Sequence, residues 1–256
     1  PISISTKVSL GEGCTPLVSG SFRGYDVLFK LEWFAPTGSF KDRGASLMMS
    51  LLKQQNISEV VEDSSGNGGA AVAAYGAAAG IKVNIVTPEN TSAAKIAQIK
   101  SYGAKIHLVP GTREETEKVA LKMAGTIFYA SHNWHPFFLQ GTKTLGYELW
   151  EDLNFKVPDN IIIPTGAGSN ILGCDMAFQE LKALGKITKL PRLFAAQPQN
   201  CSPIDASFGG IEQKNYQNNF APTIAEGTAI KAPIRLKAII AALKRSSGGT
   251  VALEED

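Results

Sequence analysis

Short apolar runs alternate along the chain with longer stretches in which apolar residues recur every three or four positions. The first pattern is typical of buried β-strands and the second of helices that bury one face. The pattern predicts strands at 60–63, 83–87, 105–109, 127–130, 160–164 and 192–196. It predicts helices at 41–54, 69–79, 93–102, 112–124, 140–153, 171–184 and 234–244. The polar stretch 213–229 is expected to be an irregular surface segment.

This strand–helix alternation with short connections predicts an α/β fold, with mostly parallel twisted sheets flanked by helices. Folds of this kind bind ligands in a crevice at the carboxyl ends of the strands. The loops that follow the predicted strands are therefore the places where functional residues are expected.

The totals exclude several classes of partner. Lys plus Arg number 25 and Asp plus Glu number 23 in 256 residues, so the net charge is +2 and neither nucleic acid nor a membrane surface is expected as a partner. No apolar run approaches the roughly 18 residues of a membrane span. The chain does not open on a signal peptide, which favours a cytoplasmic location. Three widely spaced cysteines, Cys14, Cys174 and Cys201, predict neither a disulfide framework nor a zinc site.

Two glycine-rich loops stand between a predicted strand and a predicted helix. The first glycine loop (residues 64–68) reads Ser64-Ser65-Gly66-Asn67-Gly68, and the second glycine loop (residues 166–170) reads Gly166-Ala167-Gly168-Ser169-Asn170. Glycine lets the backbone approach a ligand closely, and the free N–H groups at a helix start favour an anion. Glycine also occurs in such turns for backbone reasons alone, but two such loops in one chain favour anion binding.

A nicotinamide cofactor is an alternative ligand for the first glycine loop. The run from Gly66 to Ala71 matches the G-x-G-x-x-G/A pattern of dinucleotide-binding proteins, and Glu89 stands about 20 residues later, where the ribose-binding acid is expected. An NAD-binding oxidoreductase therefore stays open, as does a non-catalytic ligand-binding protein. The nicotinamide hypothesis leaves Lys41 unexplained.

Lys41 lies in the segment PTGSFKDRGAS (36–46), at the predicted start of a helix. A cation at that end opposes the helix dipole, whereas the neighbouring Asp42 suits it. The position of Lys41 is explained if its amine condenses with a carbonyl cofactor. Phe40 beside it offers a flat apolar face to an aromatic ring.

The segment PTGSFKDRG, then SSGN with a helix, then a GxGSN loop resemble, in this order, the motifs of the fold-type-II pyridoxal-phosphate enzymes, the tryptophan synthase β-like superfamily. Within that superfamily the chain is most similar to the threonine synthase family. Three further stretches support this, because they resemble ones that the family carries in the same order: SLGEGCTPLV (9–18), LPRLFAAQ (190–197) and TIAEGTAI (223–230). The resemblance covers nearly the whole chain.

The resemblance implies a lyase that holds pyridoxal 5'-phosphate in a cleft between two lobes. The smaller lobe would span 36–145, and the larger would combine 1–35 with 146–256. The reaction implied is β/γ-elimination or replacement on a small amino acid, with O-phosphohomoserine to threonine as the leading case and a serine/threonine dehydratase-type ammonia-lyase as the alternative. A homodimer in the cytoplasm is implied as well.

The resemblance also implies residue roles. Lys41 would bind the cofactor aldehyde and move protons at the substrate, and Asn67 would bind the 3′-oxygen of the cofactor. The whole cofactor set would be Phe40, Lys41, Asn67, Gly166, Ala167, Gly168, Ser169 and Asn170, with the last five at the phosphate. The substrate carboxylate would lie against Ser64, Ser65, Gly66 and Gly68.

Two positions depart from the family pattern. Gly68-Gly69 stands where threonine synthases usually carry a Thr-Ser or similar hydroxyl pair. In HPFFLQGTKT (135–144), Phe138 stands where the family has an arginine that grips the substrate phosphate. A phenyl ring forms no charge-assisted hydrogen bond, each of which is worth about 1.5–3 kcal/mol. Compensation would have to come from nearby polar residues, namely Ser131, His132, Asn133, Lys143 or Arg43.

Two smaller features complete the sequence-based expectations. His132 and His135 have H-x-x-H spacing without a third ligand nearby, so a structural or substrate-contacting role is favoured and no metal is expected. The family continues beyond VALEED at 251–256 with a segment that supplies a hydroxyl to the pyridine nitrogen. The given chain is therefore expected to be incomplete.

Overall fold

The computed structural model describes residues 3–64, 66–111, 113–216 and 220–255. The chain forms two compact units, Pro1–Gly141 and Thr142–Asp256, which are called the first and the second unit. The lobe boundaries implied by the resemblance, 36–145 against 1–35 with 146–256, stay a prediction.

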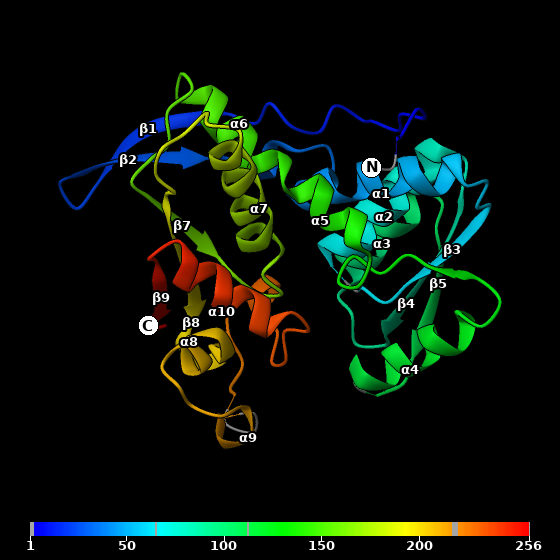
Figure 1. Ribbon diagram of the computed structural model, residues 1–256. Coiled ribbons are helices and arrows are strands. Elements are labelled where there is room, and N and C mark those ends of the chain that lie inside the picture. Colours follow the sequence, from blue (N-terminus) through cyan, green and yellow to red (C-terminus); the bar gives the residue numbers. More distant parts are fainter. Residues whose placement is uncertain (1–2, 65, 112, 217–219, 256) are drawn as a thin grey trace. The chain divides into compact units, whose positions relative to one another are not determined.

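The first unit is built on a parallel sheet with the strand order β5-β4-β3-β6 among the described residues (Figure 1). These strands are β3 (Glu59–Glu62), β4 (Lys82–Pro88), β5 (Lys105–Val109) and β6 (Phe128–Tyr129). Neighbouring parallel strands need long crossover connections, which usually contain a helix. The helices α2 (Asn67–Ala79), α3 (Ala93–Ser101) and α4 (Arg113–Met123) lie in these connections.

Helices cover both faces of this sheet. Successive side chains of a strand point to opposite faces, so Val60 and Val61 of β3 enter different cores. Val60 packs with residues of α2 and of α1 (Lys41–Gln54), whereas Val61 packs with Ala120 of α4. A sheet buried on both faces is typical of parallel α/β proteins, and the predicted fold class is confirmed.

Helix α5 (Pro136–Thr142) packs against α1 at two glycines. A Cβ atom on Gly44 of α1 would lie 2.5 Å from the ring of Phe138, and one on Gly141 would lie 2.1 Å from the carbonyl oxygen of Arg43. The two helices therefore approach each other more closely than any larger residue allows. Phe138 is fully buried in the core that this contact forms.

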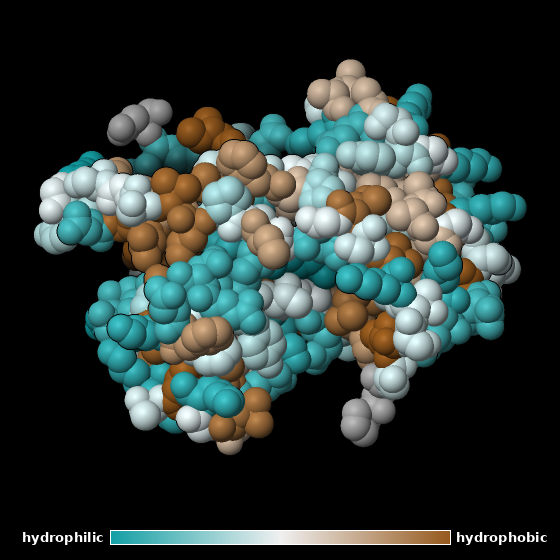
Figure 2. All heavy atoms as spheres, turned by 90° about the horizontal axis from the view of Figure 1, so that it is seen from above, coloured by the Kyte–Doolittle hydropathy of each residue, from teal (hydrophilic) through white to brown (hydrophobic). Residues whose placement is uncertain are grey.

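The sequence pattern did not predict the antiparallel hairpin of β1 (Leu17–Phe22) and β2 (Tyr25–Lys30). Its turn residues, Arg23 and Gly24, both have positive φ, at 50° and 83°. Such turns match the twist of the two strands. The hairpin and the short helix η1 (Glu32–Phe34) carry several exposed hydrophobic residues, and Figure 2 shows hydrophobic residues at the surface among hydrophilic ones. They are Val18, Phe22, Tyr25, Leu28, Phe29, Trp33 and Phe34.

The second unit is built on a parallel sheet with the order β7-β8-β9 in the part of the chain that the structure describes (Figure 1). The strands are β7 (Asn160–Pro164), β8 (Arg192–Pro198) and β9 (Gly249–Leu253). The helices are α6 (Thr144–Asp152), α7 (Ser169–Ala183), α8 (Pro203–Phe208), α9 (Gln213–Tyr216) and α10 (Leu236–Arg245), with the short helices η2 (Gln199–Cys201) and η3 (Glu226–Thr228). Phe178, Leu193 and Ile239 are fully buried in this unit.

Three elements of the structure differ from the predicted ones. The helix expected at 140–153 is divided into α5 and α6, because the N–H of Gly146 bonds the carbonyl of Lys143 in a tighter turn. The expected irregular segment 213–229 contains α9 and η3, and its residues 217–219 lie outside the described residues. Strand β9 was not predicted. Within the described ranges, the helices are all too short or too polar to cross a bilayer.

Candidate active site

Lys41 is the first residue of α1 and is half-buried. Its backbone N–H donates to Oγ of Ser39 at 3.1 Å. Its Nζ atom lies 5.0 Å from the ring centroid of Phe40 and 5.6 Å from that of Phe138. Both distances are within the range of cation–π contact. The amine is therefore held next to two flat apolar surfaces, an environment suited to an aromatic ligand.

The two charged residues after Lys41 serve the local structure. The carboxylate of Asp42 accepts hydrogen bonds from the backbone N–H and the hydroxyl of Thr37, which ties the preceding loop to α1. Burial raises the pKa of Asp42, although the bonds from Thr37 act in the opposite direction. Arg43 donates from Nε and Nη2 to both carboxylate oxygens of Glu32, at 2.8 and 2.7 Å. Such a paired contact fixes the guanidinium firmly.

The first glycine loop joins β3 to α2. Ser64 is buried and accepts a long hydrogen bond of 3.4 Å from the N–H of Gly66, while Asn67 is exposed at the first position of α2. A Cβ atom on Gly69 would lie 2.3 Å from the carbonyl oxygen of Ser64, so only glycine fits there. Ser64 thus lies tightly against the start of α2. Ser65, predicted to contact the substrate, lies outside the described residues.

A buried His–Glu pair lies against the first glycine loop. Glu62 is the last residue of β3, and its carboxylate bonds Nδ1 of His132 and accepts the backbone N–H of His132 at 3.1 Å. The ring of His132 meets the ring of Phe138 edge-on, with centroids 5.8 Å apart. A chain of contacts therefore runs from Lys41 through Phe138 to His132. Sequence reasoning missed Glu62, because nothing in the pattern links two residues 70 positions apart.

The second glycine loop joins β7 to α7. Gly168 has φ of +81°, and a Cβ atom on it would lie 2.2 Å from Cδ1 of Ile239 in α10. A Cβ atom on Gly166 would lie 3.0 Å from Cα of Thr228. The stretch 223–230 and α10 therefore close around this loop. Helix α7 has 15 residues and starts at Ser169, so its free N–H groups lie at the loop.

Asn170 adds an unsatisfied polar atom to this loop. Its Oδ1 is buried, and no described residue bonds it. Leaving a buried polar atom unpaired costs about 1–3 kcal/mol, and rotating the amide would place its NH₂ group there instead. A left-handed glycine, a helix N-terminus and an amide that lacks a partner together fit the phosphate group of a cofactor. Ala167 lies half-buried within the same turn.

Several other residues considered from the sequence have structural partners. Lys143 donates to both carboxylate oxygens of Glu180, at 2.9 and 3.1 Å, and the hydroxyl of Tyr147 donates to the same carboxylate. Burial and this bond raise the pKa of Tyr147 to about 12. Burial lowers the pKa of His135, whose Nδ1 has no bonding partner among the described residues. No cluster of three metal-ligating side chains occurs in the described ranges.

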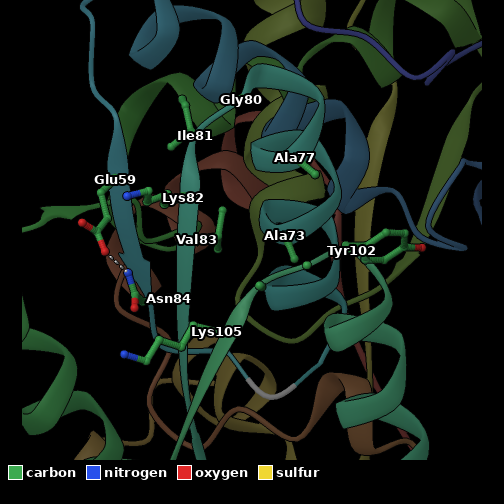
Figure 3. A pocket seen from close by; sticks show the side chains of 12 residues that line it. Glu59, Ala73, Ala77, Gly80, Ile81, Lys82, Val83, Asn84, Tyr102 and Lys105 are labelled. Carbon is green, nitrogen blue, oxygen red and sulfur yellow. Dashed lines mark hydrogen bonds between the residues drawn. The ribbon is translucent and has the colours of Figure 1, made fainter.

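A cavity of about 420 Å³ opens elsewhere in the first unit, at the amino ends of the strands (Figure 3). Its wall includes Glu59, Lys82 and Lys105, the first residues of β3, β4 and β5. Figure 3 shows the bond of 2.9 Å between Glu59 and Asn84 in this wall. The cavity lies at the opposite end of the strands from the first glycine loop, and none of the described site candidates lines it.

The structure thus gathers the candidates into two groups. The first unit brings Phe40 and Lys41 together with Phe138. It brings Ser64 and Gly68 together with His132, and Gly66 and Asn67 directly precede Gly68 in the chain. The second unit holds Gly166, Ala167, Gly168, Ser169 and Asn170 in a single turn. The individual roles of these residues stay predictions.

Comparison with known proteins decides the family. The family model for "Pyridoxal-phosphate dependent enzyme" matches residues 8–256. The chain belongs to this family. The cofactor predicted from the sequence, pyridoxal phosphate, is thereby confirmed for the family of which this chain is a member. Glu89 does follow β4 directly, where a ribose-binding acid would stand, so family membership rather than this position decides against a nicotinamide enzyme.

The chain is similar to threonine synthases. It is 34% identical to the threonine synthase of Methanocaldococcus jannaschii, over 97% of this chain and 63% of that protein. It is also 34% identical to that of Methanosarcina acetivorans, over 95% of this chain and 62% of that protein. The chain therefore spans about three-fifths of the length of these two relatives.

Solved structures share the fold. The serine racemase of Dictyostelium discoideum matches with a TM-score of 0.78 and 26% identity, over 94% of this chain and 76% of that one. A fungal L-serine ammonia-lyase from Rhizomucor miehei matches with a TM-score of 0.79 and 22% identity, over 97% of this chain and 77% of that one. These likenesses confirm that the fold is that of pyridoxal-phosphate enzymes.

Proposed function

We propose that this chain catalyses elimination or replacement at the β- or γ-carbon of a small amino acid, with pyridoxal phosphate as cofactor and Lys41 as the catalytic residue. The observation that supports this proposal most strongly is the position of the Lys41 amine next to two aromatic rings, in a chain that belongs to a pyridoxal-phosphate family. When bound, the cofactor withdraws electrons from the α-carbon of the substrate. The protein must then place its groups so that the chosen bond breaks.

The proposed tasks follow from the chemistry of each group. Lys41 Nζ would hold the cofactor by condensing with its aldehyde, with loss of water, and would accept the proton of the substrate α-carbon once the substrate amine has displaced it. Asn67 is exposed at the start of α2, from where its amide donates to the 3′-oxygen of the cofactor. The second glycine loop binds the cofactor phosphate, and the first glycine loop binds the substrate carboxylate through N–H groups at the α2 N-terminus.

The leading specific reaction is that of a threonine synthase, from O-phosphohomoserine to threonine. The names and identities of the curated relatives support it. In this reaction the substrate phosphate leaves as an anion and needs cationic partners. The assignment as a lyase, the homodimer and the cytoplasmic location belong to the same proposal.

A second candidate is a serine/threonine dehydratase-type ammonia-lyase, and the surroundings of Phe138 favour it. The ring of Phe138 is fully buried against Gly44 and contributes no charge to a substrate phosphate. The cations considered as substitutes are engaged elsewhere, Arg43 with Glu32 and Lys143 with Glu180. A substrate with a neutral hydroxyl leaving group makes no demand for these cations.

A substrate panel tests the proposal and separates the two candidates. The purified protein is loaded with pyridoxal phosphate and mixed in turn with O-phosphohomoserine, serine, threonine, O-acetylserine and O-phosphoserine, while absorbance and products are followed. We expect a change in the cofactor spectrum with at least one of them, and no turnover by Lys41→Ala. Threonine from O-phosphohomoserine supports the synthase, and a keto acid with ammonia supports the dehydratase. A fully active Lys41→Ala protein would contradict the catalytic role of Lys41.

A further inference from the structure

His132 occupies the space in which a side chain at position 68 would lie. A Cβ atom added to Gly68 would be 2.8 Å from Nδ1 and 2.9 Å from Cε1 of the His132 ring, and 2.9 Å from Oγ of Ser64. These distances are too short for any residue larger than glycine unless a neighbour moves. A hydroxyl-bearing side chain at position 68 would therefore require His132 or Ser64 to move, whereas a side chain at position 69 would meet the carbonyl oxygen of Ser64, 2.3 Å from its Cβ atom. Positions 68 and 132 are physically coupled.

Glu62 holds His132 at two points, its ring and its backbone. The carboxylate of Glu62 bonds Nδ1 with one oxygen and the backbone N–H of His132 with the other. Glu62 is fully buried, and His132 is only 7% exposed. Burying a carboxylate is costly unless it is well bonded, so this arrangement is rigid once formed. The ring is thus pinned against the backbone of the first glycine loop.

The loop beside this ring presents backbone donors to an anion. Gly68 and Gly69 add no side chain of their own at the start of α2, whose first N–H groups have no partner within the helix and favour an anion, while the ring of His132 lies against position 68. The precision of such a site depends on the residues that hold its backbone in place. His132 holds the backbone at Gly68 in place, because its ring lies where a side chain of residue 68 would otherwise be.

We propose that His132 is a positioning residue for the carboxylate of the amino-acid substrate. Held by Glu62, it fills the space beside Gly68 and fixes the first glycine loop so that its N–H groups receive the α-carboxylate. This inference rests on the proposed function, since it assumes that the loop binds an amino acid. It assigns to His132 and Glu62 a role in substrate recognition.

The test compares binding of two probes that differ in the carboxylate alone. L-Serine and 2-aminoethanol share the amine and the hydroxyl, but 2-aminoethanol lacks the carboxylate. Their dissociation constants are measured by absorbance titration of the protein loaded with pyridoxal phosphate. We expect His132→Asn to weaken L-serine binding about tenfold, the effect of a misplaced set of hydrogen bonds, and to leave 2-aminoethanol binding unchanged. The affinity for pyridoxal phosphate should also stay unchanged.

A double-mutant cycle tests the coupling between the two positions. Gly68→Ser should lower the melting temperature of the cofactor-free protein, because its side chain meets His132. In Gly68→Ser/His132→Ala the loss should be smaller than the sum of the two single losses, since the His132 ring no longer opposes the new side chain and only Ser64 remains close to it.

Glu62→Gln keeps the shape of the Glu62–His132 pair, so the variant should fold. Its affinity for L-serine should lie between that of wild type and that of His132→Asn. His107→Asn, which removes a histidine bonded to Asn84 instead, is the control and should match wild type in both probes.

The outcomes separate this inference from the proposed function. If His132→Asn binds both probes as wild type does, or loses affinity for both equally, the positioning role is overturned while the catalytic proposal stands. Additive losses in the cycle would also overturn it. If the wild-type protein fails to change its spectrum with L-serine and with every other amino acid of the panel, the proposed function itself fails.

Discussion

Phe138 is interpreted differently from the sequence and from the structure. In the sequence it replaces an arginine that the resemblance assigns to the substrate phosphate. In the structure its ring is a core side chain, packed against Gly44 and facing His132 and Lys41. The contact with Gly44 depends on how α5 packs on α1, which a local pattern does not reveal. The loss of charge was predictable, but the gain of packing was not.

Phe138→Arg should destabilise the protein and leave activity toward O-phosphohomoserine without improvement. A buried guanidinium without a partner costs about 3–5 kcal/mol. Phe138→Leu should lose less in the free energy of unfolding, because it removes some buried volume but buries no charge. Urea unfolding of both variants measures the difference. The opposite result would be a Phe138→Arg variant that is as stable as wild type and forms threonine from O-phosphohomoserine faster. It would show that position 138 can still bind the substrate phosphate.

Gly168 is required for two separate reasons, strain and space. Gly168→Ala places a Cβ atom in the left-handed region, which costs about 1–2 kcal/mol, and presses it onto Ile239. Gly185→Ala shares the positive φ, but nothing lies within 4 Å of its Cβ atom, so it isolates the strain. We expect Gly168→Ala to lose about 1–3 kcal/mol more than Gly185→Ala in urea unfolding, the usual cost of overpacking. Equal losses would mean that the second glycine loop accommodates a side chain.

The residues of the candidate site were predictable to different extents. The two glycine loops and Lys41 lie at the starts of α2, α7 and α1, and this placement follows from local strand-to-helix patterns. The pairing of Glu62 with His132 arises because β3 and β6 are neighbours in the sheet. No local signal encodes that adjacency, so the pair emerges only from the tertiary structure.

At the level of elements, long periodic helices were the most predictable. The predicted bounds of α1, 41–54, are those of the structure, because the apolar period continues unbroken between a turn and a polar end. The pattern does not reveal the hairpin β1–β2, because its Arg-Gly turn is not one of the pairs, such as Asn-Gly, that usually mark a two-residue turn. Strand β9 is five residues long, and its pairing with β8 decides its conformation. Such short strands depend on partners that lie far away in sequence.

The anchoring of the N-terminal segment on α2 should make stability depend on pH. Glu12 accepts hydrogen bonds from the hydroxyl of Tyr75 at 2.8 Å and from the N–H of Leu10 at 3.0 Å. Burial raises the pKa of Glu12, but hydrogen bonds, led by that from Ser46, outweigh burial and hold the pKa below 4.5. The contribution of Glu12 to stability is therefore present above pH 4.5 and is lost as the pH falls through the lowered pKa.

Glu12→Gln should remove this part of the acid sensitivity. The free energy of unfolding of wild type and variant, measured in urea at several pH values from 6 to 3, should converge as the pH falls. Glu89→Gln, which changes an exposed carboxyl of the same unit, is the control. A constant difference between wild type and Glu12→Gln over the whole range would contradict the anchoring role.

At the level of the whole molecule, each unit carries one group of candidate residues, and the proposed function assigns both groups to one cofactor. Cofactor binding should then stabilise both units. A ligand at one hundred times its dissociation constant contributes about 2.7 kcal/mol. Trp33 and Trp134 lie in the first unit, and Trp150 lies in the second. Variants in which phenylalanine replaces all tryptophans but one therefore report, by fluorescence, the melting of one unit at a time. Pyridoxal phosphate should raise both melting temperatures, and a rise confined to one unit would contradict a shared cofactor.

The central claim, that the amine of Lys41 holds the cofactor, is tested most directly by locating the attachment. The protein is loaded with pyridoxal phosphate, reduced with borohydride and digested, and the modified peptide is identified by mass spectrometry. We expect a stable adduct on the peptide that contains Lys41, and no adduct at comparable yield in Lys41→Ala. An adduct on another lysine such as Lys143, with Lys41 unmodified, would contradict it.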